Sequence, residues 1–233
     1  MKIKIQRSEL TEYEIVNKDV TLLEVLNEIK TTQDTSLTYS SGCRSSVCGS
    51  CAVRVNGREV LACSYHAKDG DIVEPLRNSE VIRDLVVNMD KALEFNAKAK
   101  AYQSKSTLHV ELSQDDEKIN EVQSDCILCS SCYSACPVYA VNSEFLGPFA
   151  LTRVWRYVSD KREEDSKEKI DTIQTNGVWD CTLCNECTVV CPQDISSKAD
   201  IEKLRARSSI AGYIDPSFSS FGGGFGFDGS PSF

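Results

Sequence analysis

The sequence lacks the features that would point to substrate chemistry on its own side chains. It has only two histidines, His66 and His109, and neither stands beside a plausible nucleophile. No glycine-rich dinucleotide fingerprint follows an apparent strand, so the sequence indicates no flavin or nicotinamide site of that kind. We therefore assign no catalytic residue.

Long apolar runs are also absent. None approaches the length of a membrane span, and the opening MKIKIQRSEL has neither an apolar segment nor a small-residue cleavage site. We expect no transmembrane span of its own and folding in a reducing cytoplasm, where thiols stay free. The net charge of −9 makes nucleic acid a poor partner and favours partners with basic docking surfaces.

Cysteine is abundant, with 12 residues in two zones separated by a gap from Cys63 to Cys126. Disulfides, zinc and iron–sulfur clusters are the competing explanations. A disulfide framework belongs to small secreted chains, which this chain does not resemble. The choice between zinc and iron–sulfur clusters depends on the spacing.

The first zone has the spacing of a plant-type [2Fe–2S] site, C-x4-C-x2-C with a distant fourth cysteine. Its ligands are predicted to be Cys43, Cys48, Cys51 and Cys63. Zinc ribbons favour paired C-x2-C knuckles, which this spacing does not match. The loop SGCRSSVCGSCA consists mostly of small residues, so its backbone N–H groups can wrap closely around a cluster, and Arg44 offers a positive charge beside it.

The second zone holds two near-copies, CILCSSCYSACP (126–137) and CTLCNECTVVCP (181–192). Both read C-x2-C-x2-C-x3-C-P, the run of two-cluster ferredoxins, in which the fourth cysteine ligates the other cluster. The crossed assignment gives one [4Fe–4S] cluster to Cys126, Cys129, Cys132 and Cys191. It gives the other cluster to Cys136, Cys181, Cys184 and Cys187.

The N-terminal zone is predicted to be a small β-rich unit with one helix. Residues 1–7 and the surroundings of Tyr13 alternate as strands do. Thr21 and Glu24 form a capping box that opens a helix, and Asn56-Gly57 between residues 52–55 and 59–62 predicts a hairpin.

From Ser79 to about Ser106 the apolar spacing predicts a connecting helix. The second zone is predicted to be all-α, with a helix within 144–160 that starts near Gly147-Pro148. The charged run KREEDSKEK (161–169) is expected to be a solvated face, and the Gly/Ser/Phe-rich end a mobile tail.

This arrangement resembles the iron–sulfur subunits of succinate dehydrogenases and fumarate reductases. The resemblance rests on CRSSVCGSCAVRVNG with LACSY, on VIRDLVVNMD, on CILCSSCYSACPVYAVNSEFLGPFAL and on the second run. It implies an α+β chain with an N-terminal β-grasp [2Fe–2S] ferredoxin domain followed by an all-α two-cluster ferredoxin domain. It also implies an electron relay from an FAD-containing flavoprotein subunit to a quinone or another acceptor.

Two departures from the common family pattern are informative. Most members lack the second cysteine of the second run and carry a [3Fe–4S] cluster there, whereas this chain has Cys184 and should hold a [4Fe–4S] cluster, with [3Fe–4S] as the alternative. Quinone-pocket members have a tryptophan and a histidine where this chain has Val141 and Thr182. The resemblance is therefore to the branch whose partner is a cysteine-rich subunit like that of heterodisulfide reductases, with a membrane anchor as the alternative.

The expected organisation is a [2Fe–2S] domain over 1–90, a connecting segment over 91–115, a helical domain over 116–212 and a flexible tail over 213–233. The expected role is the electron-transfer subunit of a succinate:quinone oxidoreductase or quinol:fumarate reductase, with quinone favoured over a thiol partner. The chain is expected to be peripheral on the cytoplasmic membrane through its partners, on the cytoplasmic side, with export alongside a signal-bearing partner as the alternative. A carrier with no fixed partner and a subunit of another oxidoreductase are the competing functions.

Overall fold

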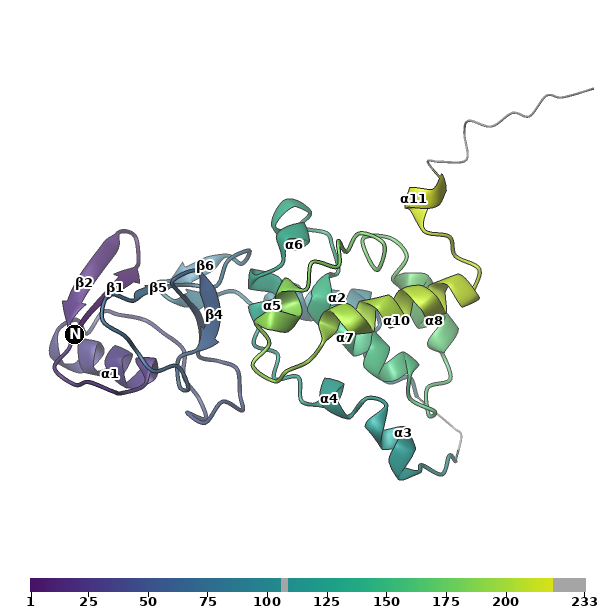
Figure 1. Cartoon of the computed structure of the whole chain (residues 1–233), viewed down its shortest axis with the longest axis horizontal. Helices are drawn as coiled ribbons and strands as arrows, with labels where there is room; N and C mark the ends of the chain where they lie inside the picture. Colours follow the sequence, from purple (N-terminus) through teal and green to yellow (C-terminus); the bar gives the residue numbers. More distant parts are fainter. Residues whose placement is uncertain (106–108, 220–233) are drawn as a thin grey trace, which may run out of the picture.

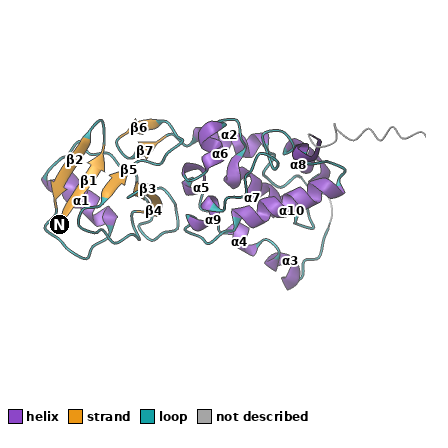
Figure 2. Ribbon diagram, turned by 45° about the horizontal axis from the view of Figure 1, so that its top comes forward, coloured by secondary structure: helices purple, strands orange, loops and turns teal. Residues whose placement is uncertain are grey.

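The chain forms a sheet-containing part followed by a helical part, side by side along the long axis of the molecule (Figures 1 and 2). This computed structural model describes residues 1–105 and 109–219. Each part has its own hydrophobic core, one running from Ile3 to Leu85 and the other from Phe95 to Leu204.

The first part is built on a mixed five-stranded sheet in the order β2-β1-β5-β3-β4. Its elements are β1 (Lys2–Gln6), β2 (Leu10–Glu14), α1 (Leu22–Thr32), β3 (Ala52–Val55), β4 (Arg58–Leu61) and β5 (Ile72–Glu74). Strands β1 and β5 pair in parallel, while the pairs β1–β2, β3–β4 and β3–β5 are antiparallel. This sheet with its single covering helix is the predicted β-grasp unit.

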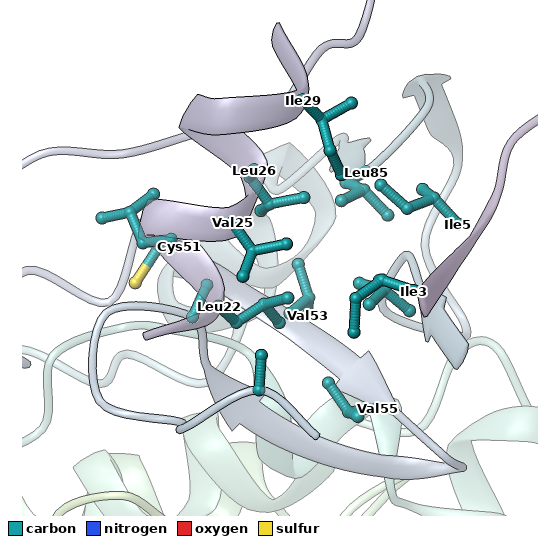
Figure 3. Packing of buried hydrophobic residues seen from close by; sticks show 14 of the residues in the cluster. Ile3, Ile5, Leu22, Val25, Leu26, Ile29, Cys51, Val53, Val55 and Leu85 are labelled. Carbon is teal, nitrogen blue, oxygen red and sulfur yellow. The ribbon is translucent and has the colours of Figure 1, made fainter. Parts of the chain in front are cut away.

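Helix α1 covers one face of the sheet. Figure 3 shows Leu22, Val25, Leu26 and Ile29 of α1 directed toward side chains of β1 and β3, among them Val53. Each of these α1 residues is at most 1% exposed, so they supply much of the apolar burial that stabilises this part.

The predicted capping box and hairpin are both confirmed. The Thr21 hydroxyl accepts a hydrogen bond from the Glu24 N–H at 3.3 Å, and the Glu24 carboxylate accepts one from the Thr21 N–H at 2.8 Å. Asn56 and Gly57 both have positive φ, 51° and 84°, as a two-residue type I′ turn between β3 and β4 requires.

The predicted helix over 79–106 is wrong in its first half. Residues Val81–Arg83 (β6) and Val86–Val87 (β7) form a two-stranded antiparallel sheet, and within the described residues 79–105 only Asp90–Lys98 (α2) is helical. Asp84 lies between the two strands with φ 48°, a left-handed conformation that ends a helix. Leu85 is buried against the first core, whereas Val81 and Ile82 are exposed, so the apolar spacing there does not mark a helical face.

The second part contains only helices and loops among its described residues, as predicted for an all-α domain. After α2 its helices are α3 (Gln114–Lys118), α4 (Glu121–Ser124), α5 (Ser131–Ser134), α6 (Pro137–Val141), α7 (Gly147–Val158), α8 (Ser166–Thr172), α9 (Glu186–Val189), α10 (Ser197–Ile210) and α11 (Pro216–Ser219). Helices α7 and α10 lie against each other and carry much of the second core (Figure 2).

The expectation that 161–169 is a solvated face is wrong at two positions. Glu163 and Lys169 are buried, and they form an ion pair at 3.3 Å between side chains that are 0% and 1% exposed. Lys169 also donates to the Ser104 hydroxyl at 2.8 Å.

The predicted tail falls largely on residues 220–233, outside the described residues. Its described beginning is ordered: the Tyr213 hydroxyl donates to Asp171 at 2.8 Å, and Pro216–Ser219 form α11. Among residues 1–105 and 109–219, no helix combines the length and the apolar character needed to cross a bilayer.

Candidate metal centres

The first cysteine loop folds back on itself between α1 and β3. It carries Cys43, Cys48 and Cys51, and Cys63 follows β4. Three of its residues are left-handed, namely Arg44 (φ 61°), Ser46 (φ 61°) and Gly49 (φ 71°). A Cβ on Gly42 would stand 3.0 Å from the Cys48 sulfur, so the small residue allows this close approach.

Backbone N–H groups of this loop point at its sulfur atoms. The Cys43 sulfur accepts from Ser45, Val47 and Cys48 at 3.4, 3.3 and 3.3 Å. The Cys63 sulfur accepts from the Ser46 N–H at 3.2 Å. Such donors stabilise thiolates, and those of Ser45 and Val47 lower the pKa of Cys43 to about 6. The loop therefore suits an anionic, sulfur-ligated group.

The two runs of the helical part have matching backbones. Leu128 and Ser130 have φ values of 58° and 60°, and the equivalent Leu183 and Asn185 have 55° and 74°. A short helix follows in each copy, α5 after Ser130 and α9 after Asn185. The repeated sequence thus folds twice into the same sulfur-presenting turn.

The cysteines of the two runs meet crosswise. One cavity is lined by Cys126, Cys129, Cys132 and Cys191, and another by Cys136, Cys181, Cys184 and Cys187. The fourth cysteine of each run thus lies with the first three of the other, the grouping expected from the spacing. All twelve cysteines of the chain are free thiols in this structure, which does not support the disulfide explanation.

The four cysteines of each set in the helical part line a cavity and do not converge on a single point. In the part of the chain that the structure describes, no three Cys, His, Asp or Glu side chains are arranged to hold one metal ion. Four thiols around a cavity are a donor set for an iron–sulfur cluster, which contains several metal atoms and sulfides. The residues present therefore fit clusters in both cavities.

The cysteines differ in burial. Desolvation raises the pKa of Cys187 to about 12 and that of Cys51 to about 11, so these thiols must lose a proton when they bind metal. Cys43, Cys48 and Cys184 are exposed. The exposed cysteines thus lie in the first loop and in the cavity of Cys136, Cys181, Cys184 and Cys187.

An arginine lies beside the first cysteine of each run, and sequence reasoning missed both. Arg153 of α7 lowers the pKa of Cys126 against the raising effect of burial, and its buried Nε atom has no hydrogen-bond partner. Arg205 of α10 donates to the carbonyl oxygens of Val178 at 2.8 Å and Cys181 at 2.6 Å. Both guanidinium groups would offset the negative charge of a nearby cluster.

The first loop also contacts the second cysteine set. A Cβ on Gly49 would stand 2.7 Å from the Ile127 carbonyl oxygen, and the Gln193 side chain donates to the Ser46 carbonyl at 3.2 Å. On the other side of the contact, Ser134 donates to the buried Glu59 carboxylate at 2.7 Å. These contacts bring the first two cysteine sets next to each other, and no sequence motif signals them.

Comparison with known proteins supports the same division. Residues 2–94 match the family described as a 2Fe-2S iron-sulfur cluster binding domain, and residues 122–195 match a 4Fe-4S dicluster domain. The 8-methylmenaquinol:fumarate reductase iron-sulfur subunit of Wolinella succinogenes is 37% identical over 86% of this chain and 68% of its own length. One chain of the fumarate reductase (CoM/CoB) of Methanothermobacter marburgensis is 32% identical over 89% of this chain but only 42% of its own length. A chain of the Sdh1 complex of Mycobacterium smegmatis in the apo form has the same fold, with a TM-score of 0.80 at 24% identity, covering 91% of this chain and 97% of that one.

Proposed function

The chain belongs to the family of iron–sulfur subunits of succinate dehydrogenases and fumarate reductases and is the electron-transfer subunit of such a complex, and we propose that its twelve cysteines hold three clusters in series. The [2Fe–2S] cluster is assigned to Cys43, Cys48, Cys51 and Cys63. The middle [4Fe–4S] cluster is assigned to Cys126, Cys129, Cys132 and Cys191. The third cluster is assigned to Cys136, Cys181, Cys184 and Cys187. The crosswise lining of the two cavities is the observation that carries this assignment.

The third cluster is proposed to be [4Fe–4S]. Cys184 lines the same cavity as the other three cysteines of its set, and a fourth thiolate can ligate a fourth iron. Cys184 is exposed whereas Cys187 is buried, so the iron at Cys184 would be the most accessible to oxidants. A [3Fe–4S] form after oxidative loss of that iron is the alternative.

Each cluster, when bound, supplies reversible one-electron transfer. The protein's own contribution is to hold the sulfurs, to direct N–H donors at them and to exclude water from the middle of the series. Cys132 illustrates the last role, since burial raises its pKa well above the ordinary value. The backbone donors around Cys43 illustrate the second.

The proposed partners are an FAD-containing flavoprotein subunit at the first cluster and an acceptor subunit at the third. Exposed Cys43 and Cys48 at one end and exposed Cys184 at the other support contacts with partners at both ends. Val141, which is 87% exposed, and Thr182 occupy the positions of the usual quinone-pocket residues, which favours a cysteine-rich partner over a haem-bearing anchor.

Quinol is the proposed second redox partner, because a similar iron–sulfur chain is part of an enzyme named for 8-methylmenaquinol. A thiol donor is the alternative, since another relative is named for CoM/CoB. We propose that the complex is peripheral on the cytoplasmic side of the membrane, held there by its partners. Export together with a signal-bearing partner is the alternative.

Purification of the native complex tests this function. We expect a large FAD-containing chain to co-purify, and we expect succinate oxidation or fumarate reduction coupled to a quinone analogue. Activity with thiols and none with quinones would replace the quinol assignment by the thiol one. A preparation that contains no flavoprotein and is inactive with both succinate and fumarate would contradict the proposal.

A further inference from the structure

A buried carboxyl group lies behind the wall of the middle centre. Thr152 of α7 and Ser197 of α10 both line the cavity of Cys126, Cys129, Cys132 and Cys191. Asp200 lies one turn beyond Ser197 on α10 and is 0% exposed. The Thr152 hydroxyl lowers the pKa of the Asp200 carboxyl, so Thr152 is a neighbour of this acid as well as a lining residue of the cavity.

The Asp200 carboxyl is only half satisfied. Its Oδ1 atom accepts from the Gln123 side-chain amide at 2.9 Å and lies 3.5 Å from the Lys203 ammonium. Its Oδ2 atom is buried with no hydrogen-bond partner, and so is the Thr152 hydroxyl. A proton on Oδ2 would turn this unpaired buried acceptor into a donor and would remove a buried charge.

The surroundings favour proton uptake. Burial raises the pKa of Asp200 to about 6, and the Lys203 charge and the neighbouring Gln123 and Thr152 side chains oppose that rise only in part. Charged residues on the helices packed against this site have other partners or are exposed. Arg153 on α7 donates to Tyr157, and Lys169 on α8 pairs with Glu163. Glu186 on α9 is exposed, and Glu202 on α10 pairs with Lys198.

We propose that Asp200 is a proton acceptor coupled to the electron relay. Its carboxylate takes up a proton from solvent when the centre bounded by Cys126, Cys129, Cys132 and Cys191 gains an electron, and releases it when the electron moves on. One O–H bond forms at Oδ2, and one O–H bond of the hydrated proton that supplies it breaks. The electron comes from the preceding centre, and the proton comes from water beside the half-exposed Lys203 side chain.

Proton uptake by Asp200 is coupled to the arrival of the electron through their opposite charges. An added electron puts a further negative charge within a poorly solvated region, which raises the pKa of a neighbouring carboxyl. Because coupling is reciprocal, a bound proton makes the same centre easier to reduce. The inference rests on the proposed ligand assignment for that centre.

The experiment is a redox titration of the intact complex, with the middle cluster followed by EPR, between about pH 5 and 8. We expect the wild-type midpoint potential to fall as pH rises. The steepest fall should approach a tenfold change in the reduction equilibrium per pH unit, or about 59 mV. In Asp200→Asn, which keeps an oxygen for Gln123 but cannot titrate, this slope should disappear.

Glu202→Gln is the matched control, because it removes one carboxylate from the same helix at an exposed position and should keep the wild-type slope. Lys203→Met gives a second test, since loss of the ammonium should move the sloping range to higher pH. An intact EPR signal with no slope in the wild type, or with the same slope in Asp200→Asn, would overturn the inference alone. Loss of the middle signal from the wild type would instead contradict the cluster assignment.

Discussion

Gly49 and Cys129 lie so close that a Cβ atom on Gly49 would stand only 2.8 Å from the Cβ of Cys129. Gly49 belongs to the first cysteine loop, and Cys129 belongs to the second set. Their contact is a point where the sheet-containing and helical parts bring two proposed clusters together. Only a residue without a side chain allows this approach, and its φ of +71° also favours glycine.

Gly49→Ala should therefore destabilise the contact between the two parts. Overpacking and left-handed strain together predict a loss of about 2–4 kcal/mol in the free energy of unfolding. Gly70→Ala is the matched control, because Gly70 has φ +83° but no atom within 4 Å of an added Cβ. It should lose only about 1–2 kcal/mol. Anaerobic chemical denaturation measures both, and equal losses would contradict the role of the contact with Cys129.

The buried ion pair of Lys169 and Glu163 gives a second prediction. Lys169→Met leaves the Glu163 carboxylate buried without its charge partner, which should cost about 3–5 kcal/mol of unfolding free energy. Lys167→Met on the same helix removes an exposed pair with Asp171 and should cost less than about 1 kcal/mol. Similar losses in the two variants, measured by denaturation, would show that the Lys169 pair contributes little.

The raised pKa of Asp200 predicts a pH dependence of stability. Between about pH 4 and 6 the folded protein holds a proton that the unfolded chain has released, so the contribution of Asp200 to stability falls as pH rises through this window. Asp200→Asn should remove this effect and gain up to about 3 kcal/mol above pH 6, with no gain below about pH 4. The difference between the denaturation curves of variant and wild type measures it. A gain that is independent of pH would contradict the assignment.

The ferredoxin motif led to the crossed assignment, in which Cys136 lies with Cys181 and Cys191 with Cys126, although the two runs are distant in sequence. Each run by itself forms a local turn whose geometry its own residues determine. The Thr21 capping box and the Asn56-Gly57 turn were predictable for the same reason.

Features that depend on distant residues could not be predicted. Gln123 and Asp200 are 77 positions apart, and neither belongs to a motif. The helix predicted from Ser79 to about Ser106 failed in its first half because exposed Val81 and Ile82 fit a helical period, while the left-handed Asp84 separates two strands. Burial of Lys169 likewise depends on Glu163 and Ser104, which a charge pattern cannot identify.

Iron analysis combined with EPR on anaerobically purified protein shows whether the chain holds three clusters and whether the cluster at Cys184 contains four irons. We expect about ten iron atoms per chain and no three-iron signal in the wild type. Cys184→Ser should contain about nine iron atoms and show an oxidised three-iron signal, with the [2Fe–2S] signal unchanged. About nine iron atoms, an intact three-iron signal and an alkylatable Cys184 thiol in the wild type would rule out a [4Fe–4S] cluster at Cys184.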